Sequence, residues 1–218
     1  MYKTKDLLNL DCTIAKEYLQ NYEYPYQIIP EIKNIILSLI EKINKNEYTE
    51  IKENVWVHKT AEIFASAYID GPTIICKDAQ VRQCAFIRGS ALIGEGAVVG
   101  NSCEVKNAIL FDKAEVPHFN YVGDSLLGEH AHMGAGAITS NLRADKANII
   151  CKDENESIET GLRKMGAILG DYAEIGCNAV LNPGVIIGRR AMVYPTSCVR
   201  GTVLENHIFK NDGVIIEK

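Results

Sequence analysis

The sequence predicts a mainly β protein: a parallel β-helix built from hexapeptide repeats, preceded by a small N-terminal α-helical cap. Apolar and mostly branched residues recur at every sixth position from Val57 to Phe111. Small residues stand two places before most of them, as at Ala61 and Ala67. A period of six is neither the 3.6 of an α-helix nor the two of a simple strand. It is typical of a parallel β-helix in which three hexads close one triangular coil.

The hexad register defines the extent of the solenoid, which we assign to residues 51–205. We expect the recurring apolar residues to fill its interior. Before the insertion these positions are Val57, Ile63, Ile69, Ile75, Val81, Ile87, Ile93, Val99, Val105, Phe111, Leu127 and Met133, and after it they are Leu169, Ile175, Leu181, Ile187, Val193 and Val199. Residues 206–218 are assigned to a C-terminal tail.

Residues 1–50 do not follow the hexad pattern and are assigned to the helical cap. The stretch "PEIKNIILSLIEKINK", residues 30–45, places isoleucines and leucines on one helical face. Pro30 stands near the expected helix start, where the missing N–H of proline costs little. We expect this segment to pack on the first coil and to cover the open end of the solenoid.

A polar insertion at residues 140–166 interrupts the repeat. Loops of this length inside a compact repeat are typically either functional or disordered. Cationic side chains in the insertion could reach an anionic ligand, although a solvated excursion would look the same in sequence. These cations are Arg143, Lys146, Arg163 and Lys164.

Composition limits the class of protein and of partner. The 218 residues are 47% hydrophobic with a net charge of −5, which fits a packed soluble core without a nucleic-acid footprint or a polybasic membrane patch. Apolar runs stay far below the roughly 18 residues needed to span a bilayer, and the charged N-terminus lacks the apolar core of a signal peptide. Seven scattered cysteines without a CxxC pair suit reduced thiols. We therefore expect a cytoplasmic protein with neither nucleic acid nor membrane as a partner.

The stretch "VPHFNYVGD", residues 116–124, breaks the repeat and contains His118. A neutral imidazole there could accept a proton from an attacking amine at neutral pH. A lone histidine is more often a structural residue, but the surrounding residues depart from the repeat, which folding alone does not require.

Two cations precede this break. Arg88 and Lys106 are separated by three hexads, one full coil, so we expect them on the same face of adjacent coils. Two neighbouring cations suit a phosphate, with the guanidinium giving bidentate contacts, although an exposed ladder of solubilising charge is the alternative. Glu104 is expected to point outward beside Lys106.

Four motifs carry a resemblance to a known family. They are "VKN" at 105–107, "VPHFNYVGDSLLG" at 116–128, "HMGAGAITSNLR" at 132–143 and "GAILGDYAEIGCNAVLNPGVIIG" at 166–188. These motifs resemble the C-terminal domain of bacterial bifunctional N-acetylglucosamine-1-phosphate uridyltransferases, which is a glucosamine-1-phosphate acetyltransferase. They are similar also to the archaeal bifunctional sugar-1-phosphate nucleotidyltransferase/acetyltransferases. The resemblance covers about residues 54–205.

The resemblance implies a left-handed β-helix that forms a homotrimer with active sites at subunit boundaries. It implies an N-acetyltransferase in nucleotide-sugar and cell-envelope precursor synthesis, with acetyl-CoA as donor and no metal requirement. The acceptor would be a hexosamine-1-phosphate, either glucosamine-1-phosphate or galactosamine-1-phosphate.

The resemblance also implies roles for single residues. His118 matches the catalytic base, and its proton would come from the 2-amino group of the sugar as that group attacks the thioester. The remaining matches are Arg88 and Lys106 at the phosphate, Tyr121 and Asn141 at the sugar, Glu104 near the amino group, and Ala135 and Cys177 near acetyl-CoA.

Three positions depart from the bacterial pattern. His132 replaces an asparagine, Leu142 replaces a tyrosine, and Cys177 replaces a serine. The first two changes touch sugar recognition and leave the acceptor sugar open. No Gly-rich basic nucleotide loop occurs near the N-terminus. Whether a separate nucleotidyltransferase acts as a partner is left open by the sequence.

Two other functions remain open from the sequence. The first is a zinc-dependent enzyme resembling the γ-class carbonic anhydrases, with His118, His130 and His132 as ligands. The second is a non-catalytic subunit that binds a sugar phosphate or a nucleotide sugar. Retention of His118 argues against pure binding, which needs no base.

Overall fold

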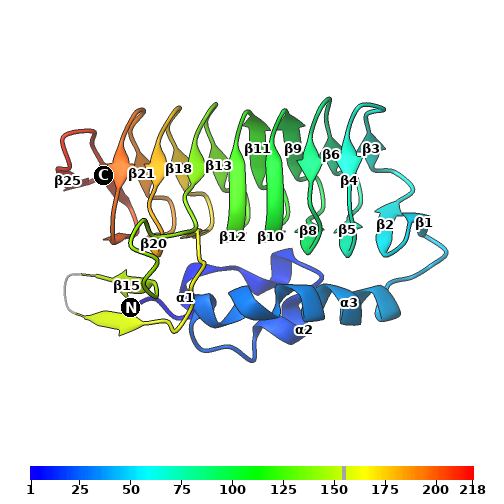
Figure 1. Ribbon diagram of the computed structural model, residues 1–218, viewed down its shortest axis with the longest axis horizontal. Helices are drawn as coiled ribbons and strands as arrows, with labels where there is room; N and C mark the ends of the chain where they lie inside the picture. The colour runs from blue at the N-terminus through cyan, green and yellow to red at the C-terminus, as the bar shows by residue number, and fades with distance from the viewer. Residues whose placement is uncertain (154–155) are drawn as a thin grey trace.

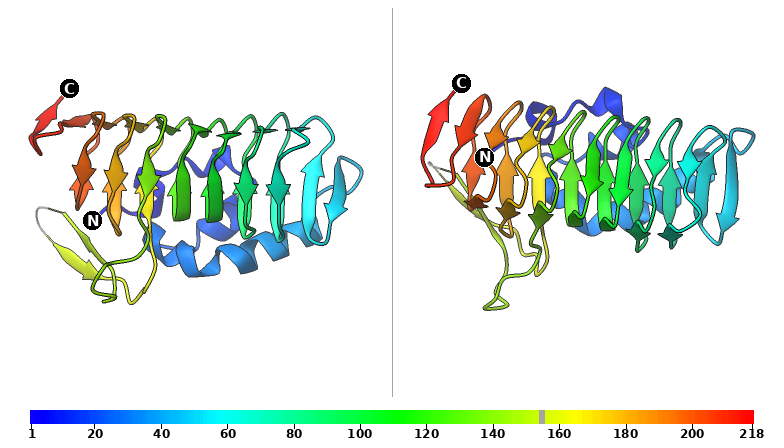
Figure 2. Two further views of the ribbon diagram at one scale, coloured as in Figure 1. Left: turned by 45° about the horizontal axis from the view of Figure 1, so that its top comes forward. Right: turned by 90° about the horizontal axis from the view of Figure 1, so that it is seen from above.

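A computed structural model of the chain describes residues 1–153 and 156–218 and confirms the predicted parallel β-solenoid. Its rungs stack along the long axis of the molecule (Figures 1 and 2). Each coil has three faces, which we number in the order in which the chain visits them.

The first face is a sheet of nine strands, parallel except for the last. Its strands are β3 (Glu62–Ile63), β6 (Gln80–Val81), β9 (Val98–Asn101), β11 (Glu115–His118), β13 (His132–Met133), β18 (Glu174–Ile175), β21 (Met192–Val193), β24 (His207–Phe209) and β25 (Ile215–Glu217). The solenoid therefore extends through β24, into the segment assigned from sequence to a C-terminal tail. The strand β25 pairs with β24 in the antiparallel direction.

The second and third faces form one 14-stranded sheet, because β10 and β12 run through the corner between them. The second face contains β4 (Tyr68–Ile69), β7 (Phe86–Ile87), the first halves of β10 (Glu104–Leu110) and β12 (Tyr121–Leu127), β14 (Ile138–Thr139), β19 (Val180–Leu181) and β22 (Cys198–Val199). The third face contains β2 (Val55–His58), β5 (Thr73–Ile75), β8 (Ala91–Ile93), the second halves of β10 and β12, β17 (Ala167–Leu169), β20 (Val185–Ile187) and β23 (Thr202–Val203). At the N-terminal end β1 (Tyr48–Lys52) pairs antiparallel with β2.

The interior of the solenoid is filled by the hexad residues, as predicted, with one exception. Phe111 is fully buried outside the solenoid, in a second apolar cluster. The register explains the difference. Val105 pairs with Ile87. Three residues later Ala108 pairs with Ala91, which lies four residues after Ile87, so the corner after Lys106 is one residue shorter than the same corner of the previous rung, after Arg88.

The N-terminal helices lie along the third face, not over the open end where we expected them (Figure 1). They are α1 (Thr4–Leu7), η1 (Leu10–Cys12), α2 (Lys16–Leu19), η2 (Pro25–Glu31) and α3 (Ile32–Lys42), where η marks a 3₁₀ helix. The helix α3 contacts β5, β8 and β10, and η2 contacts β12.

The reason for this placement is the outward side of the third face. Its strands carry three apolar or small residues in a row, so the central residue of each points outward and needs cover. These outward residues are Ile74, Leu92, Ile109, Leu126, Ile168 and Ile186, and all six are fully buried. They pack with the apolar face of α3, including Ile32, Ile36 and Leu39.

The insertion leaves the corner between the second and third faces after β14 and returns at β17. It contains the antiparallel pair β15 (Ile150–Lys152) and β16 (Ser157–Glu159), and it projects on the side of the helices (Figures 1 and 2). In the described part of the chain, no helix is both long enough and apolar enough to cross a membrane.

Substitution of Leu92 by alanine should test the helix-covered face. Leu92 has no exposed surface, so Leu92→Ala is expected to lower the free energy of unfolding by about 2–5 kcal/mol, measured by urea denaturation. The matched control is Ile51→Ala on β1, where the side chain is 55% exposed, and it should shift that free energy by no more than about 0.5 kcal/mol. Equal effects at the two positions would contradict the account of the helical segment.

Candidate functional site

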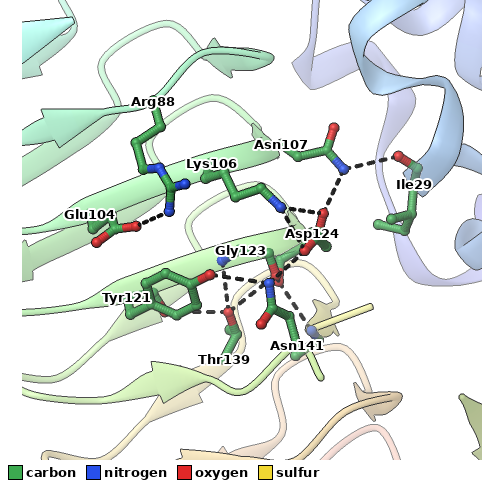
Figure 3. Close-up of polar contacts among 12 residues, drawn as sticks. Ile29, Arg88, Glu104, Lys106, Asn107, Tyr121, Gly123, Asp124, Thr139 and Asn141 are labelled. Carbon is green, nitrogen blue, oxygen red and sulfur yellow. Dashed lines mark hydrogen bonds and ion pairs between the residues drawn. The ribbon is translucent and has the colours of Figure 1, made fainter. Parts of the chain in front are cut away.

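The predicted acceptor residues gather at the corner between the second and third faces, which we call the Arg88 corner (Figure 3). The corner consists of the turns that follow β7, β14, β19 and β22 and of the bends within β10 and β12. Because Val105 pairs with Ile87, Lys106 lies one rung beyond Arg88. The expected stacking of the two cations is therefore present.

Each of these cations already has a carboxylate partner. Arg88 Nη1 is 2.8 Å from Glu104 Oε1. Lys106 Nζ is 3.1 Å from both oxygens of Asp124. The side chain of Arg88 is 46% exposed, whereas that of Lys106 is 24% exposed. Arg88 therefore offers the more accessible charge to an incoming phosphate, with guanidinium N–H groups left over from its bond to Glu104.

Asp124 is the centre of this corner and was missed by the sequence analysis. Its side chain is only 6% exposed. Besides Lys106, it accepts hydrogen bonds from Asn107 Nδ2 at 2.9 Å and Asn141 Nδ2 at 2.5 Å. Asn107 also donates to the carbonyl of Ile29 in η2, which ties the corner to the helical segment. Asp124 ends the motif His–x–x–Tyr–x–Gly–Asp, so its place in that motif is the sequence feature that could have indicated it.

Tyr121 and Asn141 meet beside Asp124 (Figure 3). Asn141 Nδ2 lies 3.1 Å from the hydroxyl oxygen of Tyr121, to which it donates. Burial raises the pKa of the Tyr121 hydroxyl, and the negative charges of Asp124 and Glu104 add to the effect. A Cβ at position 123 would come within 2.5 Å of that hydroxyl, so Gly123 leaves the space into which the tyrosine folds. The corner thus presents hydroxyl, amide, carboxylate and guanidinium groups, which can together bind a sugar phosphate.

His118 lies at the other edge of the second face, which we call the His118 corner. Its side chain is exposed, and within residues 1–153 and 156–218 the imidazole makes no hydrogen bond. The backbone there is held by Asn120, which is 2% exposed. The amide of Asn120 accepts from the His118 N–H at 3.1 Å and donates to the carbonyls of Gly134 and Ala137. The break in the repeat therefore presents an exposed imidazole on a fixed backbone.

Ala135 and Cys177 lie in the same corner as His118, on successive rungs. The N–H of Gly136 donates to the carbonyl of His118 at 3.0 Å, and the N–H of Asn178 donates to the carbonyl of Ala135 at 2.8 Å. Cys177 is an exposed free thiol. The residues predicted from sequence thus form two groups, one at each edge of the second face. Only Phe119 and Asn120 separate His118 from Tyr121 along the chain.

The two other histidines of the zinc alternative have separate neighbours. His130 stacks on Tyr172 with ring centroids 5.0 Å apart. His132 Nδ1 lies 3.0 Å from Glu174 Oε2. Among the residues that the structure describes, no three His, Cys, Asp or Glu side chains are grouped so as to hold a metal ion.

Comparisons with known proteins find one matching family model and several curated relatives that are bifunctional sugar-1-phosphate enzymes. Residues 69–160 match the family model described as the GMPPB C-terminal domain. A bifunctional sugar-1-phosphate nucleotidylyltransferase/acetyltransferase of Sulfurisphaera tokodaii is 34% identical over 167 residues, which are 77% of this chain and 42% of that protein. A bifunctional protein GlmU of Methanococcus maripaludis is 30% identical over 204 residues, 92% of this chain and 49% of that protein.

The solved structures show weaker similarity. The acetyltransferase domain of PglB from Neisseria gonorrhoeae is 16% identical, with a TM-score of 0.39, and the match covers 80% of this chain and 65% of that one. The chain spans half or less of the length of the curated relatives named above. Their sequences confirm the resemblance to the bifunctional nucleotidyltransferase/acetyltransferases that the motifs indicated.

Removal of the Asp124 carboxylate should destabilise the whole corner. Asp124→Ala removes the carboxylate partner of the Lys106 ammonium and one acceptor from each of the Asn107 and Asn141 amides. We expect the free energy of unfolding to fall by about 2–5 kcal/mol in chemical denaturation. As a control, Asp145→Ala removes a carboxylate from an exposed pair with Arg143 and should have a much smaller effect. A stability loss for Asp124→Ala no greater than that of the control would show that Asp124 does not organise the corner.

Proposed function

We propose that this chain is an acetyl-CoA-dependent N-acetyltransferase that acts on a hexosamine-1-phosphate. The observation that supports the proposal most directly is the convergence of Arg88, Glu104, Tyr121 and Asn141 on one corner, in a chain similar to sugar-1-phosphate nucleotidylyltransferase/acetyltransferases. Glucosamine-1-phosphate and galactosamine-1-phosphate are the acceptors to test first.

The acceptor is proposed to bind at the Arg88 corner. Arg88 contacts the phosphate through the N–H groups that Glu104 does not use. Tyr121 and Asn141 contact the sugar hydroxyls. Lys106 lies next to the phosphate with its charge balanced by Asp124, so we assign it a smaller share of the phosphate binding than Arg88.

His118 is proposed to act as the general base. Its neutral imidazole accepts a proton from the 2-amino group as the nitrogen attacks the thioester carbonyl. The carbon–nitrogen bond forms, the carbon–sulfur bond breaks, and coenzyme A leaves as the thiol after taking up a proton. A backbone N–H that donates to the developing oxyanion would supply a large part of the rate gain. Ala135 and Cys177, on the rungs beyond His118, are proposed to lie beside the thioester end of the donor.

The assembly is proposed to be a homotrimer with the site at subunit boundaries. His118 and the acceptor residues occupy opposite edges of the second face, so a neighbouring copy would close the space over that face. Light scattering should then give three times the 24.1 kDa mass of one chain.

The product, an N-acetylhexosamine-1-phosphate, would pass to a separate nucleotidyltransferase in cytoplasmic nucleotide-sugar synthesis.

Substitution of His118 tests the proposed base. His118→Ala should lower kcat by about 10²- to 10⁴-fold in a thiol-release assay with acetyl-CoA and hexosamine-1-phosphates. His130→Ala is the control, since His130 stacks on Tyr172 away from the proposed site, and it should retain wild-type turnover. Absence of thiol release by the wild-type protein, together with stoichiometric zinc, would favour the zinc enzyme instead. Sugar-phosphate binding without any turnover would favour the non-catalytic subunit.

Substitution of Arg88 tests the phosphate contact. Arg88→Ala should raise KM for the hexosamine-1-phosphate by about 10- to 100-fold, because a charge-assisted hydrogen bond is worth about 1.5–3 kcal/mol. KM for acetyl-CoA should not change. Arg82→Ala is a matched control, since Arg82 contacts Gln80 on the first face. An unchanged acceptor KM in Arg88→Ala would contradict the assignment of the phosphate to this corner.

A further inference from the structure

A cleft opens at the Arg88 corner, further along the solenoid than the acceptor residues. It has a volume of about 600 Å³ and lies between the start of the insertion, β15, and the turns that follow β19 and β22. Thr139 pairs with Leu181, and Leu181 pairs with Val199. The residues that follow these three, Ser140, Asn182 and Arg200, therefore stand on consecutive rungs, and all of them line the cleft.

The lining of the cleft carries excess positive charge. Its cations are Arg143, Lys152 and Arg200, and its one carboxylate is that of Asp145. Arg143 binds both oxygens of Asp145, at 2.9 and 2.6 Å, and this contact lowers the pKa of that carboxyl. Among residues 1–153 and 156–218, Lys152 and Arg200 have no carboxylate within 4.0 Å. Two charges that face one cleft thus have no carboxylate partner in the described part of the chain.

Lys152 and Arg200 belong to different elements, β15 and the turn after β22, and hydrogen bonding fixes the backbone near both. The carbonyl of Lys152 accepts a hydrogen bond of 2.8 Å from Thr202 Oγ1, two residues beyond Arg200. The neighbouring Cys151 is fully buried and contacts Met165. The strand β15 is therefore fixed against the solenoid, and its placement brings Lys152, its last residue, to the same cleft as Arg200.

Apolar side chains complete the lining. Leu142 is 42% exposed and lines the cleft with Ile150 and Pro183. Sites for small molecules typically combine apolar surface with a few well-placed polar or charged groups. The combination here suits a ligand that has phosphates and a flat apolar ring.

The position of the cleft indicates which reactant it takes. Ser140 and Leu142, on either side of Asn141, line it, so it begins where the proposed acceptor site ends, on the side away from Arg88. The acceptor phosphate is assigned to Arg88, and the other anionic reactant is the donor. Along the solenoid axis, the rung of Gly123 and that of Arg200 are three rung spacings apart, about 14 Å. The pantetheine arm of coenzyme A would have to span this distance and also cross the second face, to bring the thioester to Ala135 and Cys177 at the His118 corner.

We propose that this cleft binds the phosphorylated nucleotide end of the acyl donor, with Lys152 and Arg200 contacting its phosphates. The inference rests on the proposed acetyltransferase function and adds residues of the insertion to the donor site.

The test combines binding and kinetics on the full chain. The double variant Lys152→Ala/Arg200→Ala should weaken binding of 3′,5′-ADP and of coenzyme A in calorimetry by about tenfold or more, with a similar rise in KM for acetyl-CoA. KM for the hexosamine-1-phosphate and kcat should not change. With S-acetylpantetheine, a donor without phosphates, wild type and variant should have the same kcat/KM. The matched control, Lys113→Ala/Arg190→Ala, removes the same two charge types elsewhere and should bind 3′,5′-ADP like wild type.

The outcomes separate the two proposals. Unchanged affinity for 3′,5′-ADP in the double variant, or an equal loss in the control, would overturn the cleft assignment while leaving the transferase intact. A rise in KM for the acceptor instead of the donor would also overturn it. If wild type shows no turnover with any hexosamine-1-phosphate but binds 3′,5′-ADP through Lys152 and Arg200, the cleft assignment stands and the transferase proposal fails. Circular dichroism would check that the variants fold.

Discussion

The buried carboxylate of Asp124 is the interaction on which the proposed site depends. It joins Lys106 and Asn107 of one rung to Asn141 at the start of the insertion. Asn107 in turn binds the carbonyl of Ile29 in the helical segment. Three parts of the chain that are distant in sequence therefore meet at one corner. A buried carboxylate requires several donors, and here those donors are the groups that hold the acceptor residues in place.

The helical segment and the site meet at one departure from the repeat, where Asn107 contacts Ile29. The corner after Lys106 is one residue shorter than its predecessor, which moves Phe111 from the interior to the outer apolar cluster. The outer apolar column of the third face requires cover, and the helices provide it. The helices therefore reach the Arg88 corner from the side of the third face, where the carbonyl of Ile29 accepts a hydrogen bond from Asn107. In the described part of the chain the helices cover the third face and leave the second face open, and it is at the second face that we place the proposed reaction.

The sequence predicted the solenoid, its interior residues and the adjacent rungs of Arg88 and Lys106, because a strict period leaves few alternatives. It did not predict the position of the helices, because the six-residue period identifies the inward residues and does not single out outward ones such as Ile74 and Leu92. Asp124 was missed because a carboxylate inside a motif shows neither its burial nor its donors. The separation of His118 from the acceptor residues depends on which corner each occupies, and the slip in register made that uncertain from sequence alone.

The central claim is that this chain transfers an acetyl group to an amino-sugar phosphate. The most direct test is to incubate the wild-type protein with ¹³C-acetyl-CoA and a panel of hexosamine-1-phosphates, and to follow the products by NMR. The account predicts that the acetyl label of at least one hexosamine-1-phosphate appears in an amide bond to the 2-amino nitrogen. If a folded protein that binds coenzyme A transfers no label to any of these acceptors, the result would contradict it.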